Sequence, residues 1–199
     1  MDDIKIIYNA IANEFNRTRG YMWTGVKQFL DSIPTNSTVL ELGSGNGKNM
    51  LYRKDLNFTG IDISIEQVKI CISKGLNVTE GNITNLLFED NKFDYIICIA
   101  TYHHLDNDID RKKSLDEMYR CLKPDGKILI SVWAMEQPEY SRNKFSESDT
   151  YVTWKHKYKR YYHIYKEGQL EEEINRLNNN FTIEYIFLEE GNWYICLRK

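Results

Sequence analysis

The chain has 199 residues, enough for one domain with a full hydrophobic core, and its 42% hydrophobic and 28% charged residues exclude a disordered, collagen-like or coiled-coil chain. It carries 26 Lys and Arg against 29 Asp and Glu, and the formal net charge of −3 argues against a broadly basic nucleic-acid binder. No run of about 18 apolar residues occurs and no basic leader precedes an apolar stretch, so we expect neither a membrane span nor a secretory signal.

The four cysteines give no sign of a metal site or a disulfide. Cys71, Cys98, Cys121 and Cys196 are widely separated and form no C-x-x-C pair, and three of them, Cys71, Cys98 and Cys196, stand between Ile or Leu residues. We therefore expect reduced core thiols in a cytoplasmic protein, and we predict no bound metal.

The first 42 residues predict two helices and then a buried strand. Apolar side chains recur on one helical face at Ile4, Ile7, Tyr8, Ile11 and Phe15. A second helix is expected over residues 21–32, before Pro34. The short apolar run 38–42 stops at Gly43, as a buried strand would.

Strands and helices then alternate along the chain. We expect strands at 58–62, 77–80, 93–100 and 127–133, helices at 64–74 and 108–122, and a turn at 124–126. Ser64 is the expected N-cap of the first of these helices. A helix at 167–177 and two strands, 181–188 and 193–197, joined by a turn at 189–192, close the chain. This order predicts a single α/β domain, Rossmann-like, with a seven-stranded, mostly parallel sheet, helices on both faces and an antiparallel last strand.

One segment interrupts this alternation. Residues 135–160 are polar, contain Pro138 and end in a basic run. We expect an inserted loop on the substrate side of the sheet.

The strongest motif is a glycine loop directly after the first strand, Glu41-Leu42-Gly43-Ser44-Gly45-Asn46-Gly47. Such a loop lets a ligand approach the backbone closely at the carboxyl end of a strand. A dinucleotide fingerprint requires glycine where Lys48 stands, which leaves a NAD-binding protein as a remote alternative. A phosphate-binding P-loop fails at Leu42 and Asn49.

The pattern E-x-G-x-G-x-G resembles the first motif of class I S-adenosylmethionine (SAM) methyltransferases. The resemblance implies that Glu41, Gly43, Gly45 and Gly47 lie along the amino-acid part of SAM. It also implies that Asp62, after the second strand, accepts hydrogen bonds from the ribose hydroxyls, unless it simply ends that strand. Asn82 stands where the family usually has an Asp that accepts from the adenine amino group. The further cofactor contacts implied are Tyr8, Ile63, Ile83 and Ala100.

Longer stretches narrow the resemblance: Thr18-Arg19 with Trp23, the run IATYHHL at 99–105, VWAMEQ at 132–137, RYYHIYKEGQL at 160–170, and the end, from Asn192-Trp193-Tyr194 to Arg198-Lys199. Together they resemble the eukaryotic tRNA wobble-uridine carboxymethyl methyltransferase family. That resemblance implies methyl transfer from SAM to the carboxylate of 5-carboxymethyluridine in a tRNA anticodon loop. It also implies that residues 1–33 cover the cofactor and that a small zinc-binding activator subunit is a partner. Here the family's linker before R-Y-Y-H is shortened.

Three residues are the candidates for the reaction itself. A carboxylate is already ionised near neutral pH, so methylation requires placement rather than a strong base. Arg19 could hold the carboxylate of the substrate or that of SAM, or be a solvated charge. His104 could orient the substrate or pack in the core, and Trp133 could stack on the base or pack in the core. Glu136 and Gln137 are candidates for reading the uracil edges.

A basic, tyrosine-flanked strip is the candidate RNA contact. Its residues are Lys155, Lys157, Lys159 and Arg160, with His163 just beyond. Residues 155–160 contribute +4 from three lysines and one arginine, so the net charge of −3 averages over an uneven chain. Lysine and arginine neutralise phosphates, while tyrosines stack on unpaired bases.

Two alternatives stay open at this point. The first is a small-molecule carboxyl or hydroxyl methyltransferase, which would share every feature up to Ala100. The second is a non-catalytic binding partner in which Asn82 marks a loss of SAM affinity.

Overall fold

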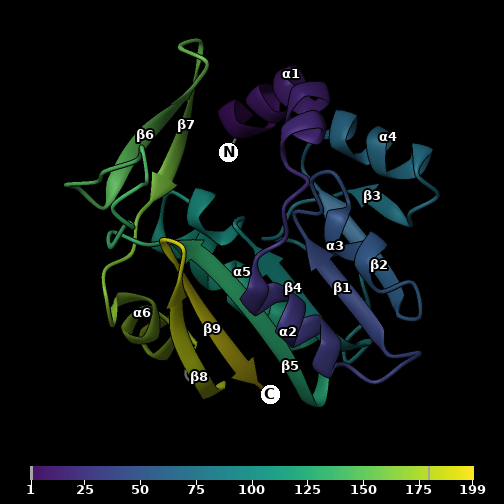
Figure 1. Ribbon diagram of the computed structural model, residues 1–199. Helices are drawn as coiled ribbons and strands as arrows, with labels where there is room; N and C mark the ends of the chain where they lie inside the picture. The colour runs from purple at the N-terminus through teal and green to yellow at the C-terminus, as the bar shows by residue number, and fades with distance from the viewer. Residues whose placement is uncertain (1, 179) are drawn as a thin grey trace.

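The computed structural model describes residues 2–178 and 180–199. Its main sheet has seven strands in the order β3-β2-β1-β4-β5-β9-β8 (Figure 1). The strands are β1 Thr38–Leu42, β2 Asn57–Asp62, β3 Val78–Glu80, β4 Phe93–Ile99, β5 Leu122–Trp133, β8 Thr182–Glu189 and β9 Asn192–Arg198. Strands β1 to β5 pair in parallel, and β9 is antiparallel to both β5 and β8. The predicted fold class and the antiparallel last strand are confirmed.

Helices cover both faces of the sheet because alternate side chains of each buried strand point to opposite sides. Leu40 and Leu42 of β1 belong to one core cluster, packed by α5 and α6, whereas Val39 belongs to the other, packed by α2. The helices are α1 Asp2–Thr18, α2 Thr24–Ser32, α3 Lys48–Tyr52, α4 Ile65–Ser73, α5 Asp108–Cys121 and α6 Gln169–Leu177, with the 3₁₀ turn η1 at Tyr102–His104. All four cysteines are buried and unpaired, as expected of core thiols.

Two local predictions are confirmed, and one helix boundary is corrected. The Ser64 side chain accepts from the Gln67 backbone N–H at the start of α4. The turn between β8 and β9 places Glu190 and Gly191 at φ 45° and 73°, the left-handed conformations that a tight hairpin requires. The second helix begins at Thr24 rather than at residue 21, because Trp23 is in extended conformation.

The segment expected as a loop at 135–160 contains part of a two-stranded ribbon. Strand β6, Asp149–Trp154, pairs antiparallel with β7, Tyr158–His163. The turn places Lys155 and His156 at φ 46° and 58° without glycine or asparagine, so the usual hairpin signal is missing from the sequence. The ribbon lies beside α1 (Figure 1), and Trp154 packs against Ile7 and Ile11 of that helix.

The turn expected at 124–126 is a bulge inside a longer strand. β5 runs without a break from Leu122 to Trp133, and its register with β4 shifts between Phe93 and Tyr95. Asp125 takes up the bend at φ 61°. Within the described ranges, no helix combines the length and the apolar character that a bilayer crossing requires.

Candidate functional site

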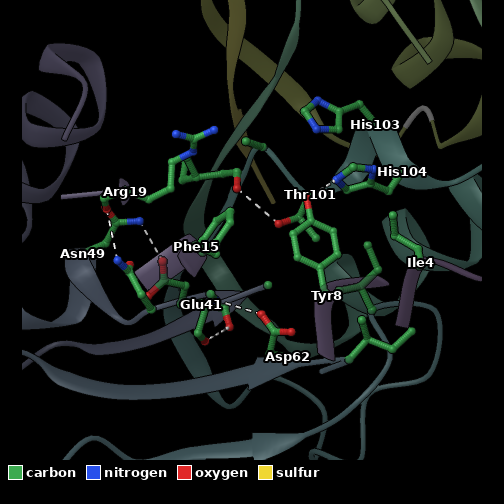
Figure 2. A pocket seen from close by; sticks show the side chains of 18 of the residues that line it. Ile4, Tyr8, Phe15, Arg19, Glu41, Asn49, Asp62, Thr101, His103 and His104 are labelled. Carbon is green, nitrogen blue, oxygen red and sulfur yellow. Dashed lines mark hydrogen bonds between the residues drawn. The ribbon is translucent and has the colours of Figure 1, made fainter. Parts of the chain in front are cut away.

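A cavity of about 410 Å³ opens at the carboxyl ends of β1, β2, β4 and β5, and α1 and the β6–β7 ribbon contribute to its wall. This is the edge where ligands bind in doubly wound sheets. The cavity is lined by ten of the predicted cofactor residues and by all three candidates for the reaction: Tyr8, Arg19, Glu41, Gly43, Gly45, Asp62, Ile63, Asn82, Ile83 and Ala100, with His104 and Trp133. Figure 2 shows Tyr8 and His104 facing one another, with Glu41 and Asp62 on another side of the cavity.

The glycine loop takes a backbone path that other residues would strain. Gly43, Gly45 and Gly47 have φ values of 73°, 52° and 74°. Gly47 is the residue before α3, whereas Gly43 and Gly45 line the cavity. The loop therefore presents bare backbone to a ligand.

Asp62 joins the loops that follow β1 and β2. Its Oδ2 accepts from the Gly45 N–H and its Oδ1 from the Ser64 N–H, both at 2.8 Å. Burial raises the pKa of Asp62 to about 6, although these two bonds oppose the rise. Each carboxylate oxygen has a further lone pair, so the pair of ribose hydroxyls can still be accepted.

Glu41 is a buried acid with one unsatisfied oxygen. Its Oε1 accepts from the Asn49 side chain at 2.7 Å, but its Oε2 has no partner among the described residues. Burial raises the pKa of Glu41 to about 8, so the side chain is largely protonated at neutral pH in the free protein. A cationic ligand group beside it would favour the ionised form.

We predict that the Glu41→Gln substitution flattens the pH dependence of stability. The folded-state pKa lies above the ordinary value of 4.5, so the folded protein binds more protons and unfolding free energy falls as pH rises from about 4.5 through about 8. Thermal melts between pH 6.5 and 9, above the range in which the shifted pKa values of Asp62 and His104 change stability, should show a loss of a few degrees in the wild type that the variant lacks. Glu171→Gln, an exposed change on α6, is the matched control. Parallel profiles for wild type and Glu41→Gln would contradict the prediction.

His104 is held by hydrogen bonds at both ring nitrogens. The Tyr161 carbonyl accepts at 2.8 Å from Nδ1, which must carry the hydrogen, and Nε2 accepts from the Tyr8 hydroxyl at 2.9 Å. Burial lowers the pKa of His104 to about 3, so the ring is neutral. Neither ring nitrogen is free in this arrangement. The remaining predicted role of His104 is to orient the substrate indirectly, by holding the Tyr8 hydroxyl in place.

Trp133 belongs to an aromatic wall beside the histidines. Its ring stacks on Tyr162 with centroids 4.2 Å apart and planes 7° apart, and Phe145 lies 5.7 Å from it. The Trp133 backbone N–H donates to His103 Nδ1 at 3.0 Å. One face of the indole is thus covered by Tyr162, and stacking of a base on Trp133 stays a prediction.

Three other predicted residues, Glu136, Gln137 and His163, lie outside the lining of this cavity, whereas Arg160 lies within it. Glu136 accepts from the Trp193 indole at 2.9 Å, and Gln137 donates to the Ala134 and Gly191 carbonyls at 2.8 Å each. The His163 Nδ1 pairs with Asp149 at 2.7 Å. These side chains anchor neighbouring segments, so their contact with uracil or RNA stays a prediction.

Sequence reasoning missed several cavity residues. Phe15, Thr101 and His103 line the cavity, and so does Tyr162. Phe15 follows the apolar period of α1, a pattern that predicts a core position. The only available signal was that Thr101, His103 and Tyr162 stand in the stretches that carry the family resemblance. Among the described side chains, no cluster of three or more His, Cys, Asp or Glu could hold a metal ion.

Comparison with known proteins agrees with this geometry. Residues 40–130 match the family model of the methyltransferase domain. The tRNA (carboxymethyluridine(34)-5-O)-methyltransferase of Schizosaccharomyces pombe is 31% identical over 219 residues, covering 97% of this chain and 94% of that protein. The chain belongs to the tRNA (carboxymethyluridine(34)-5-O)-methyltransferase family. The Arabidopsis thaliana member is 42% identical over 135 residues, and the Xenopus tropicalis member is 30% identical over 253. This chain covers only 33% and 40% of those two longer proteins.

Solved structures support the fold of this family member. A Burkholderia thailandensis 1,6-didemethyltoxoflavin-N1-methyltransferase with bound S-adenosylhomocysteine aligns with a TM-score of 0.74 at 17% identity, over 100% of this chain and 88% of that one. The methyltransferase in a complex with the Haloferax volcanii Trm112 methyltransferase activator aligns with a TM-score of 0.74 at 16% identity, over 98% and 96% of the two chains.

The residues of the cavity fit SAM, the cofactor of this fold. The unpartnered Oε2 of Glu41 suits an ammonium group, and the carboxylate of Asp62 suits a pair of hydroxyls. Arg19 is exposed at the cavity and stacks 4.9 Å over Trp154, without an ion pair among the described side chains. Asn82 Oδ1 accepts from the Thr84 N–H at 3.0 Å and has a second lone pair for an amino group.

Proposed function

We propose that the chain methylates the carboxylate of 5-carboxymethyluridine at the wobble position of a tRNA, giving the methyl ester. The near full-length match to the Schizosaccharomyces pombe enzyme carries this proposal. The cavity supports it, because a SAM-compatible edge and an aromatic, arginine-containing wall share one space of about 410 Å³.

The reaction needs alignment more than proton transfer. When bound, SAM supplies an electrophilic methyl group on a sulfonium. A carboxylate oxygen of the substrate forms the new O–CH₃ bond as the S–CH₃ bond breaks, and no proton has to leave. The neutral His104, with both nitrogens engaged, is consistent with a reaction that requires no general base. Tyr8 and Phe15 from α1 would exclude water above the reacting atoms.

The tip of the β6–β7 ribbon is the proposed tRNA contact. Lys155, Lys157 and Lys159 are exposed there, and Tyr158 lies between them. Three lysines would neutralise a few phosphates, so the salt dependence of binding should be modest.

We further propose that a small zinc-binding activator subunit assists the chain in the cytoplasm, in line with the Haloferax volcanii complex of the same fold.

The test is a nucleoside assay on hypomethylated tRNA. With SAM, and with and without a candidate activator subunit, the 5-carboxymethyluridine pool should convert to its methyl ester, as read by mass spectrometry after digestion. The Asp62→Ala variant, which loses the carboxylate that binds both loops, should lower kcat/KM at limiting SAM by about 100-fold. A pool that stays unchanged under both conditions would refute the proposed function. Turnover of free carboxylic acids without RNA would favour a small-molecule methyltransferase.

A further inference from the structure

Arg160 differs from the three lysines beside it in the sequence. Strand β7 alternates its side chains, so Lys159 is exposed while Arg160 is only 5% exposed and lines the cavity. Arg160 therefore faces the reaction space, and a phosphate on the RNA surface is not within its reach. In the sequence, Arg160 is part of a basic run, and such runs usually form a solvated surface. The sequence therefore predicts an RNA contact for it.

The Arg160 guanidinium is buried, and no described side chain supplies a counter-ion to it. Among the described side chains, which exclude residues 1–3 and 179, no carboxylate forms an ion pair with it. Within the same described set, Nε of Arg160 has no hydrogen-bond partner, and the side chain makes a single long bond of 3.4 Å, from Nη1 to the Tyr8 hydroxyl. Burial of an unpaired charge is costly, so such a group indicates a site for an anion.

Aromatic rings hold the guanidinium in place. The Arg160 Cζ lies 5.0 Å from the centroid of Trp154, 5.3 Å from Tyr162 and 5.9 Å from Tyr8. These rings compensate part of the charge and restrict the side chain, but they offer no acceptor for its N–H groups. The planar fork is thus preorganised for a ligand with two oxygens, such as a carboxylate.

Arg160 lies toward the histidines of the cavity, although its guanidinium and that of Arg19 both stack on Trp154, at 5.0 and 4.9 Å. Its neighbours Tyr8 and Tyr162 contact His104, which follows β4, where substrate approaches. Arg19, by contrast, is tied to the glycine loop through its carbonyl, which accepts from the Asn46 side chain at 3.0 Å. Figure 2 shows Arg19 well separated from both histidines. Two arginines thus match two carboxylates, that of SAM and that of the acceptor.

A second donor lines the same part of the cavity. The Trp133 N–H occupies Nδ1 of His103, so the ring hydrogen lies on Nε2, which is buried and has no partner among the described residues. This N–H could share the ligand oxygen atoms with Arg160.

We propose that Arg160 is the receptor for the acceptor's carboxylate, which it holds in line for methylation, while Arg19 serves the cofactor. This inference rests on the proposed function and names the residue that makes the site specific for an anionic wobble base. An amide in place of the carboxylate would leave the guanidinium unneutralised, so carbamoylmethyluridine should be rejected by binding as well as by chemistry.

The test measures binding apart from turnover. Two anticodon stem-loops, one with 5-carboxymethyluridine and one with 5-carbamoylmethyluridine at the wobble position, are titrated into the protein saturated with S-adenosylhomocysteine. The wild type should prefer the carboxylate by about 10-fold or more, because the amide leaves the buried guanidinium without an anionic partner. Arg160→Gln should abolish the preference, and Arg160→Lys should restore part of it.

The controls separate this inference from its rivals. Lys159→Gln, on the exposed face of the same strand, should weaken both stem-loops equally. SAM affinity by calorimetry should change less than about threefold in Arg160→Gln and should drop in Arg19→Gln. Equal binding of both stem-loops to the wild type, or a preference that survives in Arg160→Gln, would overturn the inference. Loss of SAM affinity in Arg160→Gln would assign this arginine to the cofactor. Absence of turnover with retained discrimination would instead refute the proposed function alone.

Discussion

Replacing Glu173 with alanine is expected to lower the free energy of unfolding by about 2–4 kcal/mol, because Arg111 keeps Asp108 but loses its buried carboxylate partner and two buried tyrosine hydroxyls lose their acceptor. Glu173 on α6 is 5% exposed, and its Oε2 lies 2.9 Å from Nε of Arg111 on α5. Its Oε1 accepts from the hydroxyls of Tyr102 and Tyr165, at 3.2 and 2.8 Å. One carboxylate thus ties together two helices and the 3₁₀ turn that carries His103 and His104.

The measurement is chemical denaturation of wild type and variants at pH 7. Glu171→Ala, two positions earlier on the exposed face of α6, is the control and should change stability by less than about 0.5 kcal/mol. The double variant Arg111→Met with Glu173→Leu removes both charges and should recover part of the loss, leaving the two tyrosine hydroxyls as the remaining cost. A Glu173→Ala variant within about 1 kcal/mol of wild type would show that the pair contributes little.

The sheet could be predicted because its signals are local. The strand at 38–42 is a short apolar run ended by a glycine, and the last hairpin carries Gly191 at a position that requires positive φ. The β6–β7 ribbon lacked such a signal, because Lys155 and His156 adopt the left-handed conformation with neither glycine nor asparagine in the turn. Tertiary packing of Trp154 against α1 fixes that turn instead.

The sequence could predict the site residues that are placed by the end of a strand, but not the side chains whose role depends on a distant partner. The glycine loop and Asp62 follow directly from strand ends, so their places in the cavity were expected. The partners of a side chain depend on contacts between distant segments. Glu136 reaches the Trp193 indole, and Tyr8 reaches His104 across 96 positions of the chain. Neither contact leaves a spacing that a sequence could reveal.

The position of Arg160 could not be predicted from the sequence either. In the sequence it completes a basic run, and a run of charges predicts a solvated face. Once the segment is a strand, the period of two separates Lys159 and Tyr161 from Arg160 and Tyr162. Burial then changes the meaning of the charge, from a phosphate contact to an anion site inside the cavity.

Gly43→Ala is expected to abolish SAM binding, with a loss of affinity of at least about 100-fold. Gly43 has φ 73°, and a Cβ there would lie 2.1 Å from Oγ1 and 2.8 Å from Cβ of Thr101. Strain in the left-handed region costs about 1–2 kcal/mol by itself. The overlap adds more, because relief requires the Thr101 segment to move away from the glycine loop, and that segment leads into His103 and His104.

Gly75→Ala separates the two effects, since Gly75 has nearly the same φ of 76° but open space where the methyl group of an alanine would lie. It should lose about 1–2 kcal/mol of stability and keep its SAM affinity, whereas Gly43→Ala should lose both. Calorimetric titration with SAM and denaturant unfolding measure the two quantities independently. Gly75→Ala and Gly43→Ala with equal SAM affinity would mean that the glycine loop tolerates a side chain. In that case the close packing of the β1 and β4 loops would not be what shapes the cofactor site.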